Sequence, residues 1–162
     1  MDFNRSDSPT LGVEIELALV DNDTAALNSA CPALLAALGE LPRGAVKPEL
    51  MQCYIELNTG VCQTVGEAAS ELRGNLKTLQ AAADAQNVSL LWSATHPFSS
   101  WHDQQVTENE RYHGLVNLLQ DTARQLITFG LHVHVGVDSG DKAVMICDRM
   151  LRHLPTLLAA SC

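Results

Sequence analysis

The feature that most constrains this sequence is an alternating stretch near its beginning, Thr10 to Val20, which carries two glutamates. Apolar residues alternate with small or acidic ones, as in a β-strand with one buried face. Glu14 and Glu16 share the second face and lie about 6 to 7 Å apart along the strand. Carboxylates this close repel each other unless water, a basic side chain or a divalent cation compensates. The stretch therefore predicts a strand with an acidic face.

A second extended stretch, from Val46 to Thr59, repeats this pattern near its end. Cys53, Ile55 and Leu57 alternate with polar residues, and Glu56 belongs to the polar set. Glu56 alone is explained most simply as a solvated strand residue. In a continuous strand Glu49 would point to the opposite face from Glu56, because one position is odd and the other even. Glu49 therefore joins Glu56 only if a bend or bulge separates them.

A third stretch, from Thr128 to Val137, places two histidines and two glycines on one strand face. A single histidine is more often structural. The pair His132 and His134, flanked by glycine, can instead offer imidazoles to a metal ion or a phosphate. If helices cover the opposite side of the sheet, the acids and histidines of three strands gather on one concave surface.

Helical patterns occupy much of the remaining chain. The clearest runs from Thr64 to Gln86, where Thr64 and Glu67 form a capping box ahead of a continuous apolar stripe. A short apolar strand is expected from Val88 to Ala94. Further helices are expected over three other ranges: Cys31 to Leu38, Glu108 to Leu126, and Lys142 to His153, with another apolar helix starting at Pro155.

Composition narrows the functional classes. The chain has 162 residues, 46% of them hydrophobic, which suits one domain with a real core. Ten Lys and Arg against nineteen Asp and Glu give a net charge of -9, which argues against a nucleic-acid binder. The five cysteines are odd in number, without a C-x-x-C pair, and no signal peptide or membrane-spanning run is recognisable, so a cytoplasmic location is expected.

Carboxylate oxygens with an imidazole suit Mg²⁺ or Mn²⁺ better than zinc, which would draw on more His or Cys. Such ions could hold a polyphosphate and stabilise charge during phosphoryl transfer. The sequence contains no G-x-x-x-x-G-K-[ST] and no G-x-G-x-x-G motif. Metal ions rather than a glycine loop would therefore hold a nucleotide.

Five separated motifs carry a family resemblance: TLGVEIEL, VKPELMQCYIELNTGVC, THPFSSW, NERYHGL and FGLHVHVGVDSGD. In this order they resemble the N-terminal half of the carboxylate-amine ligases of the glutamate-cysteine ligase type 2 family. The resemblance implies an α+β, glutamine-synthetase-like catalytic fold, with a mainly antiparallel sheet and helices on one face. It also implies ATP with Mg²⁺ or Mn²⁺, activation of a glutamate-like carboxylate as an acyl phosphate, and attack by an amine such as that of cysteine.

The resemblance also implies site residues. By its motifs, the metal and nucleotide site would comprise Glu14, Glu16, Glu56 and His134, with Glu49 as a further metal ligand. Arg111, from the E-R-Y motif, and His96, from the T-H-P-F motif, would contact substrate or phosphate.

The family's catalytic domain continues beyond the length of this chain. Residues 10–162 are therefore expected to be the N-terminal part of a truncated catalytic domain. Residues 1–9 are polar and rich in Ser and Asp, so they are expected to be a flexible lead-in. The expected partners are amino-acid substrates and ATP, with an exposed sheet edge that favours homo-oligomers. Two alternatives stay open: an inactive binding or oligomerisation module of the same fold, and a purely structural acidic sheet.

Overall fold

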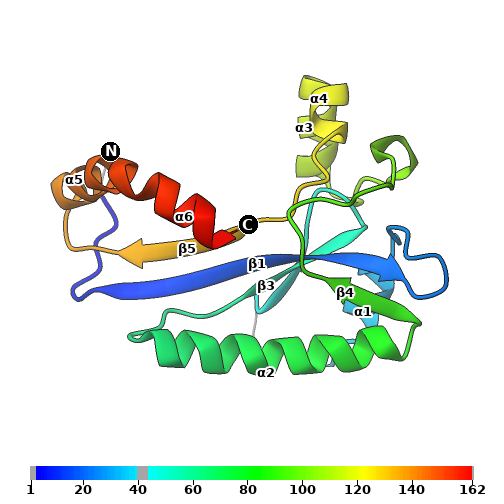
Figure 1. The fold of residues 1–162 in the computed structure, drawn as a ribbon, viewed down its shortest axis with the longest axis horizontal. Helices are drawn as coiled ribbons and strands as arrows, with labels where there is room; N and C mark the ends of the chain where they lie inside the picture. The colour runs from blue at the N-terminus through cyan, green and yellow to red at the C-terminus, as the bar shows by residue number, and fades with distance from the viewer. Residues whose placement is uncertain (1–2, 40–43, 162) are drawn as a thin grey trace.

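The computed structural model describes residues 3–39 and 44–161 (Figure 1). A five-stranded sheet is organised around one long strand, β1, which pairs with β3 along one edge and with β4 and β5 along the other. β2 adds outside β3, and every pairing is antiparallel. The predicted α+β class with an antiparallel sheet is confirmed. The strands are β1 (Thr10–Asp21), β2 (Val46–Pro48), β3 (Tyr54–Asn58), β4 (Val88–Leu91) and β5 (Leu131–Gly136).

The register of this sheet brings the polar strand faces together. Glu16 of β1 lies opposite Glu56 of β3, and Glu14 lies opposite His132 of β5. Because side chains of directly opposed residues point to the same face, the acids and histidines of three strands share one surface. The prediction that these strands contribute to a common face is confirmed.

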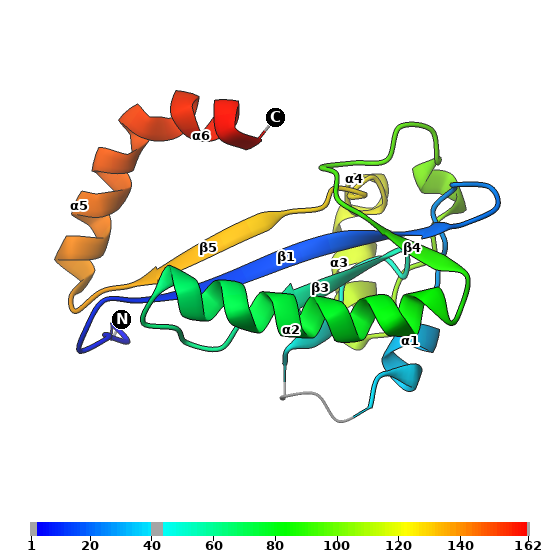
Figure 2. The same ribbon diagram turned by 60° about the horizontal axis from the view of Figure 1, so that its bottom comes forward.

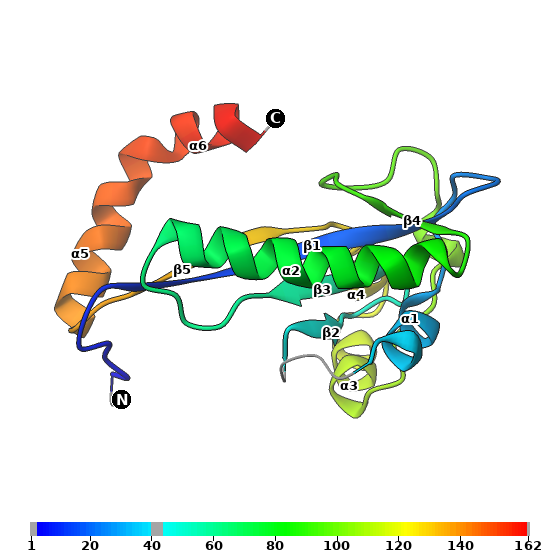
Figure 3. The same cartoon turned by 90° about the horizontal axis from the view of Figure 1, so that it is seen from below.

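Two helices cover the other face of the sheet, as Figure 3 shows from below. α1 spans Cys31–Ala37 and α2 spans Val65–Asp84. The Thr64 side chain accepts a hydrogen bond from the Glu67 amide, which confirms the predicted cap at the start of α2. Buried side chains from β1, β3 and both helices form the main core: Leu17, Leu19, Leu34, Ile55, Leu57 and Leu79.

The acidic face is not left open along its whole length, which corrects the expectation of helices on one side only. α3 (Glu110–Leu119) and α4 (Asp121–Arg124) stand on this face in Figure 1. Here Ala18 and Tyr54, from the polar sides of their strands, pack with Tyr112 and Phe129 in a second buried cluster. Apolar residues at polar-face positions therefore close one end of this surface, and the carboxylates lie beside that closed end.

Three local predictions need correction. The helix expected from Glu108 to Leu126 breaks at Gln120, whose φ of 51° is incompatible with a right-handed helix. The extended stretch from 46 to 59 is interrupted between β2 and β3. Cys53 precedes β3, so it joins the second cluster instead of sharing a face with Ile55.

The segment after β5 lies apart from both cores. It comprises α5 (Gly140–Met150), a short 3-10 turn (Leu151–His153) and α6 (Leu154–Ser161), and none of its described residues is buried. The Ser139 side chain caps α5 by accepting a hydrogen bond from the Lys142 amide. Residues 3–9 form no helix or strand. No helix among the described residues is long and apolar enough to cross a membrane.

Leu79 provides a test of the main core, because its side chain in α2 has no exposed surface. Leu79→Ala should lower the free energy of unfolding by about 2 to 5 kcal/mol, through lost burial and the cavity left behind. Leu118→Ala in α3 is the matched control: Leu118 is 78% exposed, so its loss should change stability by about 0.5 kcal/mol or less. Urea denaturation measures both, and equal effects would contradict this description of the core.

Candidate functional site

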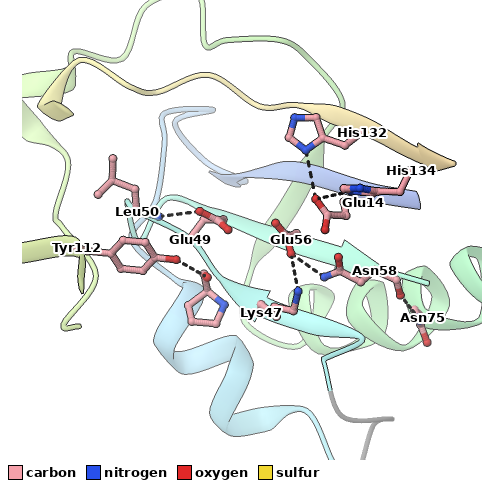
Figure 4. A network of polar contacts seen from close by, with 11 residues as sticks. Glu14, Lys47, Glu49, Leu50, Glu56, Asn58, Asn75, Tyr112, His132 and His134 are labelled. Atoms are coloured by element: carbon pink, nitrogen blue, oxygen red, sulfur yellow. Dashed lines mark hydrogen bonds and ion pairs between the residues drawn. The ribbon is translucent and has the colours of Figure 1, made fainter. Parts of the chain in front are cut away.

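Three glutamates from separate parts of the sheet converge on the acidic face. One carboxylate oxygen from each of Glu16, Glu49 and Glu56 lies within 4.8 Å of the other two. Glu16 belongs to β1. Glu56 belongs to β3, whereas Glu49 follows β2 (Figure 4). We call these three residues the acid triad. Only 6% of the Glu56 surface is exposed, so the explanation of this residue as a solvated strand position is wrong.

The Glu56 carboxylate is held by a chain of polar contacts that ends on helix α2. Its Oε1 atom accepts a hydrogen bond from Asn58 Nδ2 at 2.7 Å and contacts Lys47 Nζ at 3.2 Å. Asn75 of α2 in turn donates to the main-chain carbonyl of Asn58 at 3.0 Å (Figure 4). Lys47 and Asn58 therefore stabilise the charge of Glu56 and fix its orientation.

Glu49 reaches the triad because the chain bends between β2 and β3. The bend is secured from outside: Thr107 Oγ1 donates to the Glu49 carbonyl at 2.5 Å, and the Thr107 amide donates to the Leu50 carbonyl at 2.9 Å. Tyr112 in α3 donates through its hydroxyl to the Pro48 carbonyl at 3.2 Å. The bend that the sequence required for Glu49 to join Glu56 is thus present, and residues 107–112 hold it.

Glu16 is fixed by the approach to β5. Its Oε2 atom accepts a hydrogen bond from the Gly130 amide at 2.6 Å. A Cβ atom at Gly130 would lie 3.1 Å from His132 Nε2 and 3.5 Å from Glu16 Oε2. A side chain at residue 130 would therefore require the His132 ring to shift by a few tenths of an ångström.

The electrostatics of the triad show uncompensated negative charge. Partial burial raises the pKa of Glu49 to about 7. The hydrogen bond to Glu56 and the negative charges of Glu56 and Glu16 add to this increase. Burial and the neighbouring Glu49 also raise the pKa of Tyr112. Within the described chain, Lys47 makes the only ion pair to a triad member. One basic side chain for three carboxylates leaves this site favourable for a further cation.

A second polar group lies beside the triad on the same face. Glu14 Oε2 is 3.3 Å from His132 Nδ1 and 3.3 Å from His134 Nε2. Burial opposes ionisation of Glu14, but hydrogen bonds with His134 and His132 prevail and lower its pKa. The structure thus separates the five predicted metal ligands into two groups: Glu16, Glu49 and Glu56 in the triad, and Glu14 with His134 next to it.

The donor atoms of the triad fit a hard divalent cation. All three are carboxylate oxygens, the ligands preferred by Mg²⁺ and Mn²⁺, and no sulfur ligand is among them. On an octahedral Mg²⁺ adjacent oxygens are about 3 Å apart and opposite oxygens about 4.2 Å, so the three side chains would move closer together to bind one ion. The negative charges of Glu56 and Glu16, which add to the burial that raises the pKa of Glu49, would also favour a bound cation.

The two residues predicted to contact substrate lie in different settings. Arg111 is exposed in the first turn of α3, with its guanidinium 5.6 Å from the centre of the Tyr112 ring. His96 is buried, and both ring nitrogens engage main-chain groups: Nδ1 accepts from the Ser99 amide and Nε2 lies 3.0 Å from the Ala25 carbonyl. His96 therefore links two loops, whereas contact of either residue with substrate stays a prediction.

Sequence reasoning did not single out several residues that shape the site. Asn58 shares the Glu56 face by simple alternation, so period-two patterning already contained its signal. Lys47 was missed because its contact depends on the pairing of β2 with β3, where Lys47 lies opposite Glu56. Asn75 was missed because its contact depends on how α2 packs.

Comparison with known proteins agrees with this architecture. The family model described as "Glutamate-cysteine ligase family 2 (GCS2)" matches residues 10–162. This chain therefore belongs to glutamate-cysteine ligase family 2. Three relatives that share the name "Putative glutamate--cysteine ligase 2" come from Thermobifida fusca, Gloeobacter violaceus and Mycobacterium ulcerans, at 42%, 40% and 41% identity over 98%, 98% and 99% of this chain.

The chain spans only 41%, 43% and 41% of the length of those three relatives. A solved structure, the glutamate–cysteine ligase of Francisella tularensis in complex with AMP, aligns with a TM-score of 0.63 and 15% identity. The alignment covers 95% of this chain and 31% of that one. At this identity the likeness shows a shared fold.

The raised pKa of Glu49 predicts a pH dependence of stability. An acid with a pKa of about 7 in the folded protein and 4.5 otherwise binds more protons when folded, so stability falls as pH rises between these values. Glu49→Gln carries no charge and should flatten this fall. Urea denaturation at several pH values in metal-free buffer, with the exposed Glu108→Gln as control, measures the effect. An unchanged slope in Glu49→Gln would contradict the assignment.

Proposed function

We propose that this chain provides the metal-binding wall of an ATP-dependent carboxylate-amine ligase. The observation that carries the proposal is the acid triad, whose three carboxylate oxygens lie within 4.8 Å of one another beside a single lysine. Membership of the glutamate-cysteine ligase family supports the reaction class. Because the relatives are more than twice as long, activity is proposed for the complete ligase architecture rather than for this part alone.

Each residue of the triad has a definable task. Glu16, Glu49 and Glu56 would hold Mg²⁺ or Mn²⁺, which would neutralise the nucleotide phosphates and the charge that develops during phosphoryl transfer. Asn58 and Lys47 keep the Glu56 carboxylate in place, and Gly130 does so for Glu16. Glu49 would release its proton when a cation binds, because the ion replaces the proton in balancing charge.

Glu14 and His134, the other two predicted ligands, adjoin the triad and would complete the coordination of metal or phosphate. Arg111, at the start of α3, would contact a substrate carboxylate or a phosphate. His96 would keep the neighbouring loops in place and is a candidate for substrate contact only if those loops move.

The proposed reaction joins a glutamate-like carboxylate to an amine. A carboxylate oxygen attacks the γ-phosphorus of ATP, ADP leaves, and an acyl phosphate forms. The amine then attacks the acyl carbon, phosphate leaves, and the amine loses its proton. The names of the relatives suggest glutamate as the acid and cysteine as the amine.

A second candidate function is a binding or oligomerisation module with no activity of its own. The observation in its favour is the segment α5 to α6, in which no described residue is buried. Such a module would not need the acid triad to bind a cation, so metal binding separates the two functions.

Removal of one triad carboxylate tests the proposed site. Mg²⁺ or Mn²⁺ at about a hundred times its Kd should stabilise the chain by about 2.7 kcal/mol and raise Tm by about 5 to 10 °C. Glu56→Gln should lose most of this gain, because one ligand and the anchor for Lys47 are altered together. Differential scanning fluorimetry, with and without metal and ATP, measures the shift.

Glu108→Gln is the control, since Glu108 is an exposed carboxylate outside the triad whose one ion pair within the described chain is with His113. It should retain the full metal-dependent gain. An equal gain in Glu56→Gln and wild type would remove the triad from the proposed function, and no gain in any variant would favour the inactive module.

A further inference from the structure

Lys47 belongs to a row of charged side chains that crosses the acidic face. It lies opposite Glu56 in the pairing of β2 with β3, and Glu56 lies opposite Glu16 in the pairing of β3 with β1. Directly opposed residues point to the same face, so one lysine and two glutamates stand side by side across three strands. The Lys47 Nζ atom is 3.2 Å from Glu56 Oε1. A positive charge is therefore part of the site proposed for a divalent cation.

The two partners of this ion pair differ in their freedom to move. The Glu56 side chain is 8% exposed, whereas that of Lys47 is 47% exposed. Glu56 Oε1 also accepts a hydrogen bond from Asn58 Nδ2, and Figure 4 shows both donors on the side of Glu56 away from Glu49. Lysine has a flexible stem, so Lys47 can withdraw into water while Asn58 keeps the carboxylate in place.

The charge of Lys47 also reaches the neighbouring polar group. Burial opposes ionisation of Glu14, but hydrogen bonds with His134 and His132 lower its pKa. The charge of Lys47 makes a smaller contribution in the same direction. Coulomb repulsion between a lysine and a divalent cation acts over similar distances. Lys47 would therefore oppose a cation at the acid triad even if the two share no carboxylate oxygen.

We propose that Lys47 is a built-in counter-charge of the acid triad, which stabilises the three carboxylates until a divalent cation takes over this role. The lysine and the cation compete for the same negative charge, so Lys47 weakens the binding of the cation. This keeps the site intact between binding events and makes the metal easier to release. The inference rests on the metal site of the proposed function and adds its regulation by a side chain outside the triad.

A purely structural role for Lys47 predicts a different result. If Lys47 served only to hold Glu56, its loss would lower both the stability of the protein and its affinity for metal, because a displaced ligand binds less well. If Lys47 acts through its charge, its loss lowers stability in metal-free buffer but raises the affinity for a divalent cation. Only the proposal gives the two effects opposite signs.

Neutral and charged substitutions of Lys47 separate these roles. Isothermal titration calorimetry measures the Kd for Mn²⁺, and urea denaturation in metal-free buffer measures stability. We expect Lys47→Met and Lys47→Gln to unfold at lower urea concentration and to bind Mn²⁺ more tightly than wild type, by about tenfold or more. Gln can still donate a hydrogen bond to Glu56, so it removes the charge with the least disturbance. Lys47→Arg keeps the charge and should stay within about threefold of the wild-type Kd.

Lys142→Met is the matched control. Lys142 Nζ is 2.7 Å from Asp138 Oδ2 and its side chain is 45% exposed, so it is a lysine in a comparable ion pair. It lies in α5, which stands away from β3 in Figure 2. Its loss changes the net charge of the protein as Lys47→Met does, but far from the triad, so the Kd for Mn²⁺ should not change.

Two results would overturn the inference. The first is an equal or weaker affinity for Mn²⁺ in both neutral variants while the wild type binds, which would leave Lys47 only a structural role. The second is an equal gain in affinity in Lys47→Met and Lys142→Met, which would assign the effect to net charge. Absence of Mn²⁺ binding from the wild type and from every variant would instead refute the proposed metal site, and this inference with it.

Discussion

The antiparallel register of β1 against β3 is the constraint on which the rest of the structure depends. It buries Leu17, Ile55 and Leu57 over α2 and, on the reverse face, places Glu16 directly opposite Glu56. Like charges opposite each other destabilise a strand pair, so the apolar face must outweigh this cost. A slip of one residue would expose the core and bury the acids, which makes the register and the site inseparable.

Much of this arrangement follows from the sequence because strand alternation is a local property. The polar faces with Glu14, Glu16, Glu56 and His134 could be read directly, as could the Thr64 cap. What could not be read depends on contacts between distant segments. The bend that carries Glu49 is held by Thr107 and Tyr112. The break at Gln120 is a backbone conformation that the apolar pattern of the expected helix from Glu108 to Leu126 does not reveal.

The acid triad and the apolar face of β5 lie on opposite sides of the same sheet. The triad leaves negative charge that a cation would balance, and Leu131, Val133 and Val135 of β5 are exposed. The chain spans 41% to 43% of the length of the relatives that it matches. Glu14 and the two histidines of β5 adjoin the triad on the acidic face.

The central claim is that the acid triad binds a divalent cation, and paramagnetic broadening of backbone amide signals by Mn²⁺ tests it most directly. The amides of Gly130 and Leu50 donate to the carboxylates of Glu16 and Glu49. We expect these two signals, with that of Glu56, to broaden first at substoichiometric Mn²⁺. Broadening that begins at another acidic segment, such as the Asp21–Thr24 turn, while Gly130 and Leu50 stay sharp, would contradict the claim.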